Sequence, residues 1–414
     1  MARAVAISRG NEKSAGLVRS ATGGTLGAPV NRIFRVLAIL TVLTAPLALY
    51  AGRDAAKPAS HTEYRAYVGN YTTKTDSKGI YEFRFDAATG KMSALELAGE
   101  TKDPSWVAVH PSGKYLYAAN EMGKASTVSA FAIEPKSGKL TLLNELPALG
   151  EDPCHLSFDR TGKFLFSANY TSGNVVVYPI LADGKLGEHT ALVTDQGTTG
   201  PNKKRQDRSH AHWIASSESN RLVYVADLGL DRVLVYKFDA AKGTLAATQD
   251  SAEFKPGIGP RHVAFSKDRK FMYVLGELES TVTVFASEST GKSRSMQTVP
   301  MLPAGFSGRN DAAEIEIHPS GKFLYASNRG RDSIVVYSID SRNGTLSQVA
   351  EVPTGGKEPR HFAIDPTGNF LLAENQNSDT IVEFRIDLAT GKLTATGETL
   401  SVPSPICIMF LRLE

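Results

Sequence analysis

Arginine, histidine and glutamate side chains stand where strands of an apolar core should begin or end. Residues 259–265, GPRHVAF, place Arg261 and His262 directly before an apolar run, and Glu277 directly follows another one, FMYVLG at 271–276. Guanidinium groups hold anions through forked hydrogen bonds, and imidazole and carboxylate groups transfer protons. The pattern therefore predicts either a site that binds and transforms a polar substrate or a buried ion pair.

Related arrangements occur elsewhere in the chain, as KEPRHFAI at 357–364 and EDPCHLSF at 151–158. The candidate site residues fall into two groups, those at the starts of first strands and those just past the ends of second strands. The first group is His155, His210, His212, Arg261, His262, Glu314, Arg360 and His361. The second group is Glu121, Tyr170, Glu277, Arg329 and Gln376.

These residues belong to a unit that occurs seven times. The copies can be aligned at Trp106, His155, Trp213, His262, Glu314, His361 and Cys407. In six of them a polar turn such as HPSGK follows the first strand, then come two aromatic or β-branched strands and a second turn such as TGK. Four short strands in a period of roughly 40–50 residues are typical of a β-propeller.

The two ends of the repeat region complement each other. The first copy lacks its opening strand, and the chain ends on an extra one, SPICIMFLRL at 404–413. We therefore predict an all-β fold for residues 62–414: a seven-bladed propeller of four-stranded antiparallel blades, closed by the C-terminal strand joining the N-terminal blade.

Strand direction predicts which face carries the site. The first strand of each copy runs away from its PRH-like start and the second returns, so the candidate residues should share one face near the axis. The residues Asn70, Asn120, Asn169, Asp227, Asn328 and Asn375, at equivalent strand ends, should be structural caps that bond their own backbone. His110 and His318 lie in turns on the opposite face, where we expect them to be solvated.

The longest spacing between copies contains the basic stretch TGPNKKRQDRSHAHW, residues 199–213. It ends in His210 and His212 on the face that should carry the site. The sequence leaves two interpretations equally open: a solvated loop, or a lid that reaches a negatively charged substrate.

The N-terminal residues follow a different pattern. Residues 1–35 are basic, and VLAILTVLTAPLALY at 36–50 is uncharged, which indicates a secretory signal or an uncleaved membrane anchor, with a short linker up to residue 60. The protein should then be periplasmic or secreted, or anchored, and cytoplasmic only if the true start is internal. Residues 1–51 hold six basic residues and one acidic residue, so the net charge of +3 becomes −2 without them, and nucleic acid is not expected as a partner.

Neither a disulfide nor a metal site is predicted. Cys154 and Cys407, the two cysteines, are expected to be free buried thiols. The scattered acidic residues show no metal-ligand spacing. We expect no cofactor, and the oligomeric state cannot be read from the sequence.

Several of these stretches carry a resemblance to a known family. YVGNYT at 67–72, DPCHLSFDRTGKFLFSANYTSGNVVVYPI at 152–180, GPRHVAF at 259–265 and AEIEIHPSGKFLYASNRGRDSI at 313–334 resemble the propeller-type 6-phosphogluconolactonases, a family that includes carboxy-cis,cis-muconate cyclases. The likeness extends from residue 64 to the C-terminus. The sequence departs from the family at Gly276, where Asn is more frequent.

The resemblance implies a hydrolase that opens a sugar-type lactone, a small molecule expected to be anionic. In that hypothesis Glu277 is the base, with His212 as its rival, Arg261 and His262 stabilise the oxyanion, and Arg329 and Arg360 hold an anionic group. His155, His210, His361 and Gln376 complete the expected binding site. The alternatives are an exported propeller that binds a ligand or protein without chemistry, and a lactone-forming cyclase of the muconate type that uses the same residues.

Overall fold

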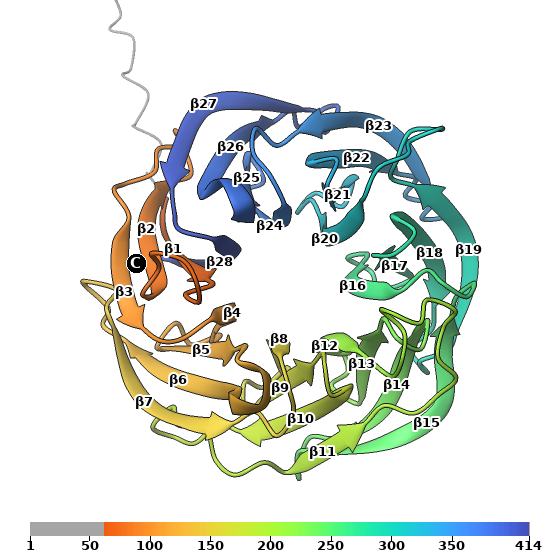
Figure 1. The fold of residues 1–414 in the computed structure, drawn as a ribbon, viewed down its shortest axis with the longest axis horizontal. Helices are drawn as coiled ribbons and strands as arrows, with labels where there is room; N and C mark the ends of the chain where they lie inside the picture. The colour runs from red at the N-terminus through yellow and green to blue at the C-terminus, as the bar shows by residue number, and fades with distance from the viewer. Residues whose placement is uncertain (1–61, 414) are drawn as a thin grey trace, which may run out of the picture. The chain divides into compact units, whose positions relative to one another are not determined.

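Residues 62–413, which the computed structural model describes, form a ring of seven four-stranded antiparallel sheets (Figure 1). The innermost strands are β4 (Pro104–Val109), β8 (Pro153–Phe158), β12 (Ala211–Ser216), β16 (Pro260–Phe265), β20 (Asp311–Ile317), β24 (Pro359–Ile364) and β28 (Pro405–Arg412). The second strands are β1 (Glu63–Asn70), β5 (Tyr115–Asn120), β9 (Phe164–Asn169), β13 (Leu222–Asp227), β17 (Phe271–Gly276), β21 (Phe323–Arg329) and β25 (Phe370–Asn375).

The third and fourth strands complete each blade toward the outside of the ring. The third strands are β2 (Gly79–Asp86), β6 (Thr127–Ile133), β10 (Asn174–Pro179), β14 (Arg232–Asp239), β18 (Thr281–Ser287), β22 (Ser333–Ile339) and β26 (Thr380–Ile386). The outermost strands are β3 (Glu96–Glu100), β7 (Leu140–Pro147), β11 (Ala191–Thr194), β15 (Thr244–Glu253), β19 (Ser293–Pro300), β23 (Leu346–Pro353) and β27 (Leu393–Ser401). The described helices are two 3-10 turns, η1 (Gly123–Ala125) and η2 (Gln376–Ser378); within residues 62–413 no helix is long and apolar enough to cross a membrane.

The C-terminal strand closes the ring, as predicted. Strand β28 pairs antiparallel with β1, with Tyr67 opposite Met409, and the sheet runs in the order β28-β1-β2-β3. The first blade is therefore built from both ends of the repeat region. Closure pairs strands that would otherwise be free edges open to another chain.

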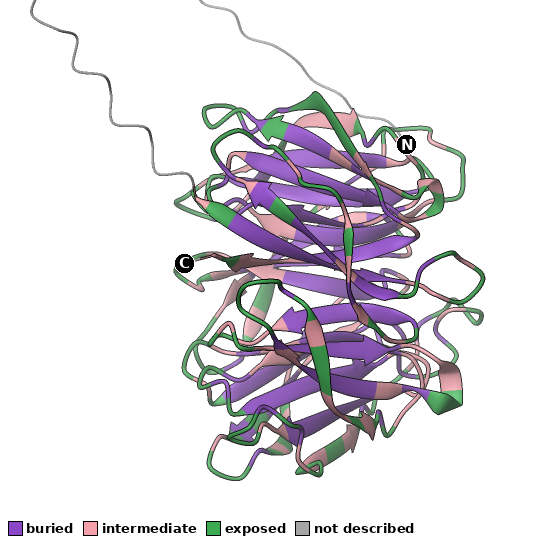
Figure 2. Ribbon diagram, turned by 90° about the vertical axis from the view of Figure 1, so that its left-hand side faces the viewer, coloured by how far each residue is buried: buried purple, intermediate pink, exposed green. Residues whose placement is uncertain are grey.

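The core lies between neighbouring blades. Figure 2 shows that the inner strands are mostly buried while exposed residues gather in the loops. One apolar cluster joins the last blade to the first: Phe370 of β25 packs edge-on against Phe85 of β2, with ring centroids 5.7 Å apart. The branched and aromatic residues that favour strands thus also supply the contacts that hold the blades together.

A repeated tyrosine links one blade to the next. The hydroxyls of Tyr67, Tyr117, Tyr273 and Tyr325, all on second strands, donate to carbonyls of glycines in the outer turn of the following blade. For Tyr325 the acceptor is Gly391 at 2.8 Å, and the tyrosine is fully buried. The hydroxyl therefore has little access to water as an alternative partner.

Replacing Tyr325 by phenylalanine should lower the free energy of unfolding by about 1 kcal/mol, the usual net value of a buried hydrogen bond. Urea denaturation at neutral pH would measure it. Tyr115→Phe is the control, because the Tyr115 hydroxyl makes no hydrogen bond to residues 62–413 and its ring is only partly buried. Equal stability of Tyr325→Phe and the wild type would contradict a stabilising role for the bond.

Of the predicted strand-end caps, Asp227 bonds the backbone of its own turn as expected, since its Oδ1 accepts the N–H of Leu230 at 2.9 Å. The asparagine amides instead donate to backbone carbonyls outside their own turns. Asn169 donates to the carbonyl of Ala148 at 3.0 Å and Asn375 donates to Thr354 at 3.3 Å. Both acceptors precede the innermost strand of the same blade, 21 residues upstream. These amides therefore fasten the chain where it crosses from one blade to the next.

The expectation that His318 is solvated was wrong. Its side chain is buried, and its Nε2 lies 2.8 Å from the carbonyl of Gly368, in the equivalent turn of the next blade. His110 makes the same contact with Gly162 at 2.9 Å and is partly buried. Both histidines join neighbouring blades on the face opposite the candidate site.

Candidate functional site

Strand pairing brings the two predicted groups of residues to one face, as the strand directions required. Pro260, before Arg261, lies opposite Gly276, before Glu277, in the β16–β17 pair. Asp311 lies opposite Arg329 in the β20–β21 pair. We call the part of this face around Arg261, Glu277, Arg329 and Arg360 the mouth.

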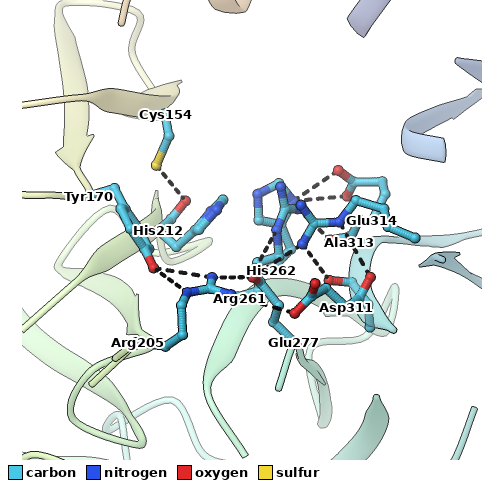
Figure 3. A network of polar contacts seen from close by, with 12 residues as sticks. Cys154, Tyr170, Arg205, His212, Arg261, His262, Glu277, Asp311, Ala313 and Glu314 are labelled. Carbon is cyan, nitrogen blue, oxygen red and sulfur yellow. Dashed lines mark hydrogen bonds and ion pairs between the residues drawn. The ribbon is translucent and has the colours of Figure 1, made fainter. Parts of the chain in front are cut away.

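Glu277 is the centre of a buried arginine cluster. Its Oε2 lies 3.1 Å from Nε of Arg261, and its Oε1 lies 3.2 Å from Nη2 of Arg329 and also contacts Nη2 of Arg205. The Glu277 side chain is 3% exposed. One carboxylate thus accepts three guanidinium groups from three different parts of the chain. Figure 3 shows two of them, Arg205 and Arg261, beside Glu277.

Arg261 and Arg329 are also anchored to the backbone of strand β20. Arg261 donates to the carbonyl of Ala313, and Arg329 donates to the carbonyls of Asp311 and Ala312, each at 3.3 Å. Their side chains are 3% and 8% exposed. Both guanidinium groups are therefore fixed in place.

The arginines determine the charge of Glu277. Burial by itself would raise the pKa of this carboxyl, but Arg329, Arg261 and Arg205 outweigh burial and hold the pKa at about 2. Burial and the neighbouring Arg329 lower the pKa of Arg261 to about 10. At neutral pH Glu277 is therefore a carboxylate and a weak proton acceptor, and Arg261 is a cation.

His262 lies beside this cluster with one ring nitrogen held and the other free. Its Nδ1 lies 2.9 Å from Oε2 of Glu314, whereas its Nε2 has no hydrogen-bond partner within residues 62–413. The ring is 2% exposed. Burial, together with the charges of Arg261 and Arg360, holds the pKa of His262 well below its usual value, so the imidazole is neutral at neutral pH.

Glu314 connects His262 to a second buried pair. His361 Nε2 lies 3.6 Å from Glu314 Oε2, and His361 Nδ1 lies 2.7 Å from Glu374 Oε2. Burial lowers the pKa of His361 to about 4 and, together with Glu314, raises the pKa of Glu374 well above its usual range. The structure thus brings His361 next to His262 through a carboxylate.

His155 and His212 complete the group of neutral imidazoles. The ring of His262 lies 5.4 Å from that of His155 and 5.2 Å from that of His212, measured between centroids. His155 also packs against Trp106, with ring centroids 4.4 Å apart. His212 Nδ1 is buried without a partner in the described chain, and burial holds the pKa of both rings well below the usual value.

Arg360 differs from Arg261 and Arg329, the other arginines of the mouth, because no carboxylate of residues 62–413 forms an ion pair with it. Its guanidinium lies over the ring of Tyr71, 5.7 Å from the centroid, and the Tyr71 hydroxyl donates to Glu121 at 2.8 Å. Tyr71, Glu121 and Glu277 keep Arg360 charged, since their electrostatic interactions outweigh burial and raise its pKa. Arg360 is thus a cation at the mouth without a committed partner.

Two predicted residues lie at the edge of this arrangement. His210 stacks on Tyr170 and has both ring nitrogens engaged, Nδ1 with the carbonyl of Tyr170 and Nε2 with Asp207, each at 3.0 Å. Gln376 begins η2, and in the described chain its side chain makes no hydrogen bond or ion pair to the mouth residues. The structure therefore gives His210 a loop-holding contact, and within residues 62–413 it gives the Gln376 side chain no polar contact with the cluster.

Three functional candidates were missed from the sequence. Arg205 lies in the basic run 203–208, where nothing distinguishes it from its neighbours, and Tyr71 lies in YVGNYT. Glu374 reads as one polar residue within a strand. Tyr71 could have been found from the sequence, because it directly follows the strand-end Asn70 in the same way that the candidate Tyr170 follows Asn169.

Cys154 and Cys407 are free and buried, as predicted. Cys154 Sγ lies 3.5 Å from the carbonyl of His212, and burial raises the pKa of both thiols. In the described part of the chain no three histidine, cysteine or acidic residues are grouped so that they could hold a metal ion.

A family model described as "Lactonase, 7-bladed beta-propeller" matches residues 65–410 of this sequence. The chain belongs to this lactonase family. It is 37% identical over 352 residues to a 6-phosphogluconolactonase of Bacillus subtilis, covering 85% of this chain and 99% of the relative.

Solved structures agree with this family assignment. A periplasmic gluconolactonase of Pseudomonas aeruginosa matches with a TM-score of 0.81 and 33% identity, covering 85% of this lactonase-family chain and all of the other. A putative 6-phosphogluconolactonase from Bacteroides fragilis matches with a TM-score of 0.79 and 33% identity, covering 86% and 100% of the two chains. The whole propeller, including the mouth, is therefore within the region of similarity.

Proposed function

We propose that the mouth hydrolyses the ring ester of a sugar lactone that carries an anionic group. The observation that carries the proposal is the neutral, oriented imidazole of His262 with a free Nε2 beside a cluster of fixed arginines. A base for water and cations for developing negative charge are what ester hydrolysis requires. The relatives named as a gluconolactonase and a 6-phosphogluconolactonase support the substrate class.

In the proposed reaction His262 is the general base. When its Nδ1–H donates to Glu314, Nε2 is the basic nitrogen and can take a proton from water as the water oxygen attacks the lactone carbonyl. The tetrahedral intermediate then breaks the ring C–O bond, and the same imidazolium returns the proton to the leaving alkoxide. The product is the open-chain hydroxy acid, so lactone and water are fully accounted for.

Glu277 has a different proposed role from the base first expected of it. A carboxylate with a pKa of about 2 accepts protons poorly at neutral pH. We assign it the task of holding Arg261 and Arg329 in place, with Arg261 facing the developing oxyanion. His212, whose Nδ1 is free and buried, is the second candidate for the base.

Titration of released acid in a pH-stat tests the proposal, with glucono-lactone as the neutral substrate and 6-phosphogluconolactone as the anionic one. The expected result is hydrolysis well above the buffer rate, with preference for the phosphorylated lactone. Rates equal to buffer on both, from folded protein, would overturn the proposal and favour a non-catalytic binding propeller. Lactone formation from an unsaturated acid, in place of hydrolysis, would favour the cyclase reaction.

Arg360 is the proposed partner of the substrate's anionic group. Arg360→Lys keeps the charge but loses the planar fork, so KM for the anionic lactone should rise by roughly 5–30-fold, the equivalent of about 1–2 kcal/mol. The neutral lactone should be hydrolysed almost unchanged. Steady-state kinetics on both substrates checks this; equal losses on both would assign Arg360 a structural role.

We also propose that the protein is exported. Residues 1–60, which carry the signal or anchor pattern, lie outside the described residues, and the support is that pattern together with the similarity to a periplasmic gluconolactonase. Fractionation of the native host, with the intact mass of the isolated protein, would distinguish a cleaved signal from an anchor. Full-length protein in the cytoplasm would contradict export.

A further inference from the structure

Arg205 reaches the mouth from a loop that is itself firmly held. The loop connects β11 to β12, and Gln206, which is fully buried, donates to the carbonyl of Leu228 at 2.9 Å. The backbone N–H of Arg205 donates to Asn202 at 3.0 Å, and that of His210 donates to Asp227 at 2.9 Å. The side chain of Arg205 therefore extends from a fixed point, and the loop need not move for the guanidinium to move.

Both carboxylates bound by Arg205 have other cationic partners. Glu277 remains paired with Arg261 and Arg329 at 3.1 and 3.2 Å. Asp311, 3.5 Å from Nη1 of Arg205, is also paired with Nε of Arg309 at 3.2 Å. Departure of Arg205 would therefore leave no carboxylate of the cluster without a cation.

Arg205 is also the least fixed of the three guanidinium groups around Glu277. Its side chain is 36% exposed, against 3% and 8% for Arg261 and Arg329, and it makes no bond to a backbone carbonyl in the described chain. Its remaining contact is with the hydroxyl of Tyr170, at 3.2 Å (Figure 3). An ion pair whose cation is partly in water is weaker than a buried one.

We propose that Arg205 determines specificity for lactones with an anionic substituent: without substrate it caps Glu277, and with substrate its guanidinium turns to the phosphate or carboxylate at the mouth. Glu277 accepts three guanidinium groups where one would neutralise it, so the cluster carries an excess of positive charge that an arriving anion would balance. This inference rests on the proposed lactone hydrolysis and adds to Arg360 a second residue that selects the anionic substrate. This role would also give a function to the long loop between β11 and β12, which brings Arg205 into contact with Glu277, 72 positions further along the chain.

Kinetics of Arg205→Gln on the phosphorylated and the neutral lactone test the inference. We expect KM for 6-phosphogluconolactone to rise roughly tenfold or more, the range expected for losing a charged hydrogen bond, with kcat changed less than about threefold. For neutral glucono-lactone kcat/KM should be unchanged or higher, because the cap is gone. Arg205→Lys should give an intermediate KM, since it keeps the charge without the fork.

Arg208→Gln is the matched control. Arg208 lies on the same loop, is 64% exposed and pairs with Asp207 at 3.0 Å, so its loss should leave the preference between the two lactones unchanged. Equal losses on both lactones in Arg205→Gln, or an unchanged preference, would overturn the role of Arg205 alone. No hydrolysis of either lactone by the folded wild type would instead overturn the proposed function and this inference with it.

Discussion

Replacing His262 by asparagine should lower kcat for lactone hydrolysis by roughly 100- to 10,000-fold, the usual contribution of a general base. Asparagine can keep a polar contact with Glu314 but has no basic nitrogen at the position of Nε2. Because the ring makes no ion pair with the arginines that are assigned to the substrate, KM should change little. Steady-state kinetics on both lactones measures the two constants separately.

The pH dependence of kcat/KM provides a second test of His262 as the general base. Burial and Arg261 hold the pKa of His262 well below its usual value, so the base stays deprotonated in mildly acidic solution. The acid limb of kcat/KM should therefore lie below about pH 6.5, the value for an unperturbed histidine. The limb should be absent from the residual activity of His262→Asn.

His189→Asn is the control for the loss of a histidine, because His189 is exposed on the connection before β11. A fall in kcat of less than about tenfold in His262→Asn would reject His262 as the base. The same measurement on His212→Asn would then decide whether His212 acts in its place.

Glu314 should act through His262 rather than on the substrate. Its Oε2 lies 2.9 Å from His262 Nδ1 and its Oε1 accepts the backbone N–H of Ile315 at 3.0 Å, so it fixes the orientation of the ring. Sequence alone could not show this pairing. The two residues are 52 positions apart and occupy equivalent positions in successive copies, where a glutamate reads only as a departure from the repeat.

The fold could be predicted because the repeat encodes it locally. The polar turns and the strand patterns occur in nearly every copy, so a strand or turn that is hard to predict in one copy can be inferred from the others. The face that carries the site could also be predicted, because an antiparallel pair must bring the start of one strand beside the end of the next. The pairing of Pro260 with Gly276 is the direct result, and it places Arg261 near Glu277.

The roles within the site could not be predicted in the same way. Arg329 and Arg360 were expected to have the same role, yet Arg329 is bonded to two backbone carbonyls and Arg360 has no anionic partner in the described chain. Glu277 was expected to be the base, and burial alone would raise the pKa of its carboxyl. Three arginines reverse that shift, and one of them, Arg205, comes from a loop with no repeat to indicate where it leads.

Replacing Glu277 by glutamine should lower the free energy of unfolding at neutral pH by about 3–5 kcal/mol, the usual result of removing one partner from a buried ionic cluster. Arg261 and Arg329 would remain buried, bonded to the backbone of β20 but without a counter-charge. Urea denaturation measures the difference. Glu279→Gln is the control, because Glu279 is exposed two residues further along the same segment.

The pH dependence separates this charge effect from a loss of packing. Glu277 has a folded pKa of about 2 against an unfolded value near 4.5, so its ionisation stabilises the protein above about pH 4.5 and this contribution is lost as the pH falls through 2. The difference between wild type and Glu277→Gln should therefore shrink by about 2 kcal/mol between about pH 7 and pH 3. A difference that stays constant with pH would mean that the glutamate acts by shape alone. If the stability difference shrinks as predicted, the pKa of Glu277 in the folded protein is too low for a general base at neutral pH. That result would support assigning the base to the imidazole of His262.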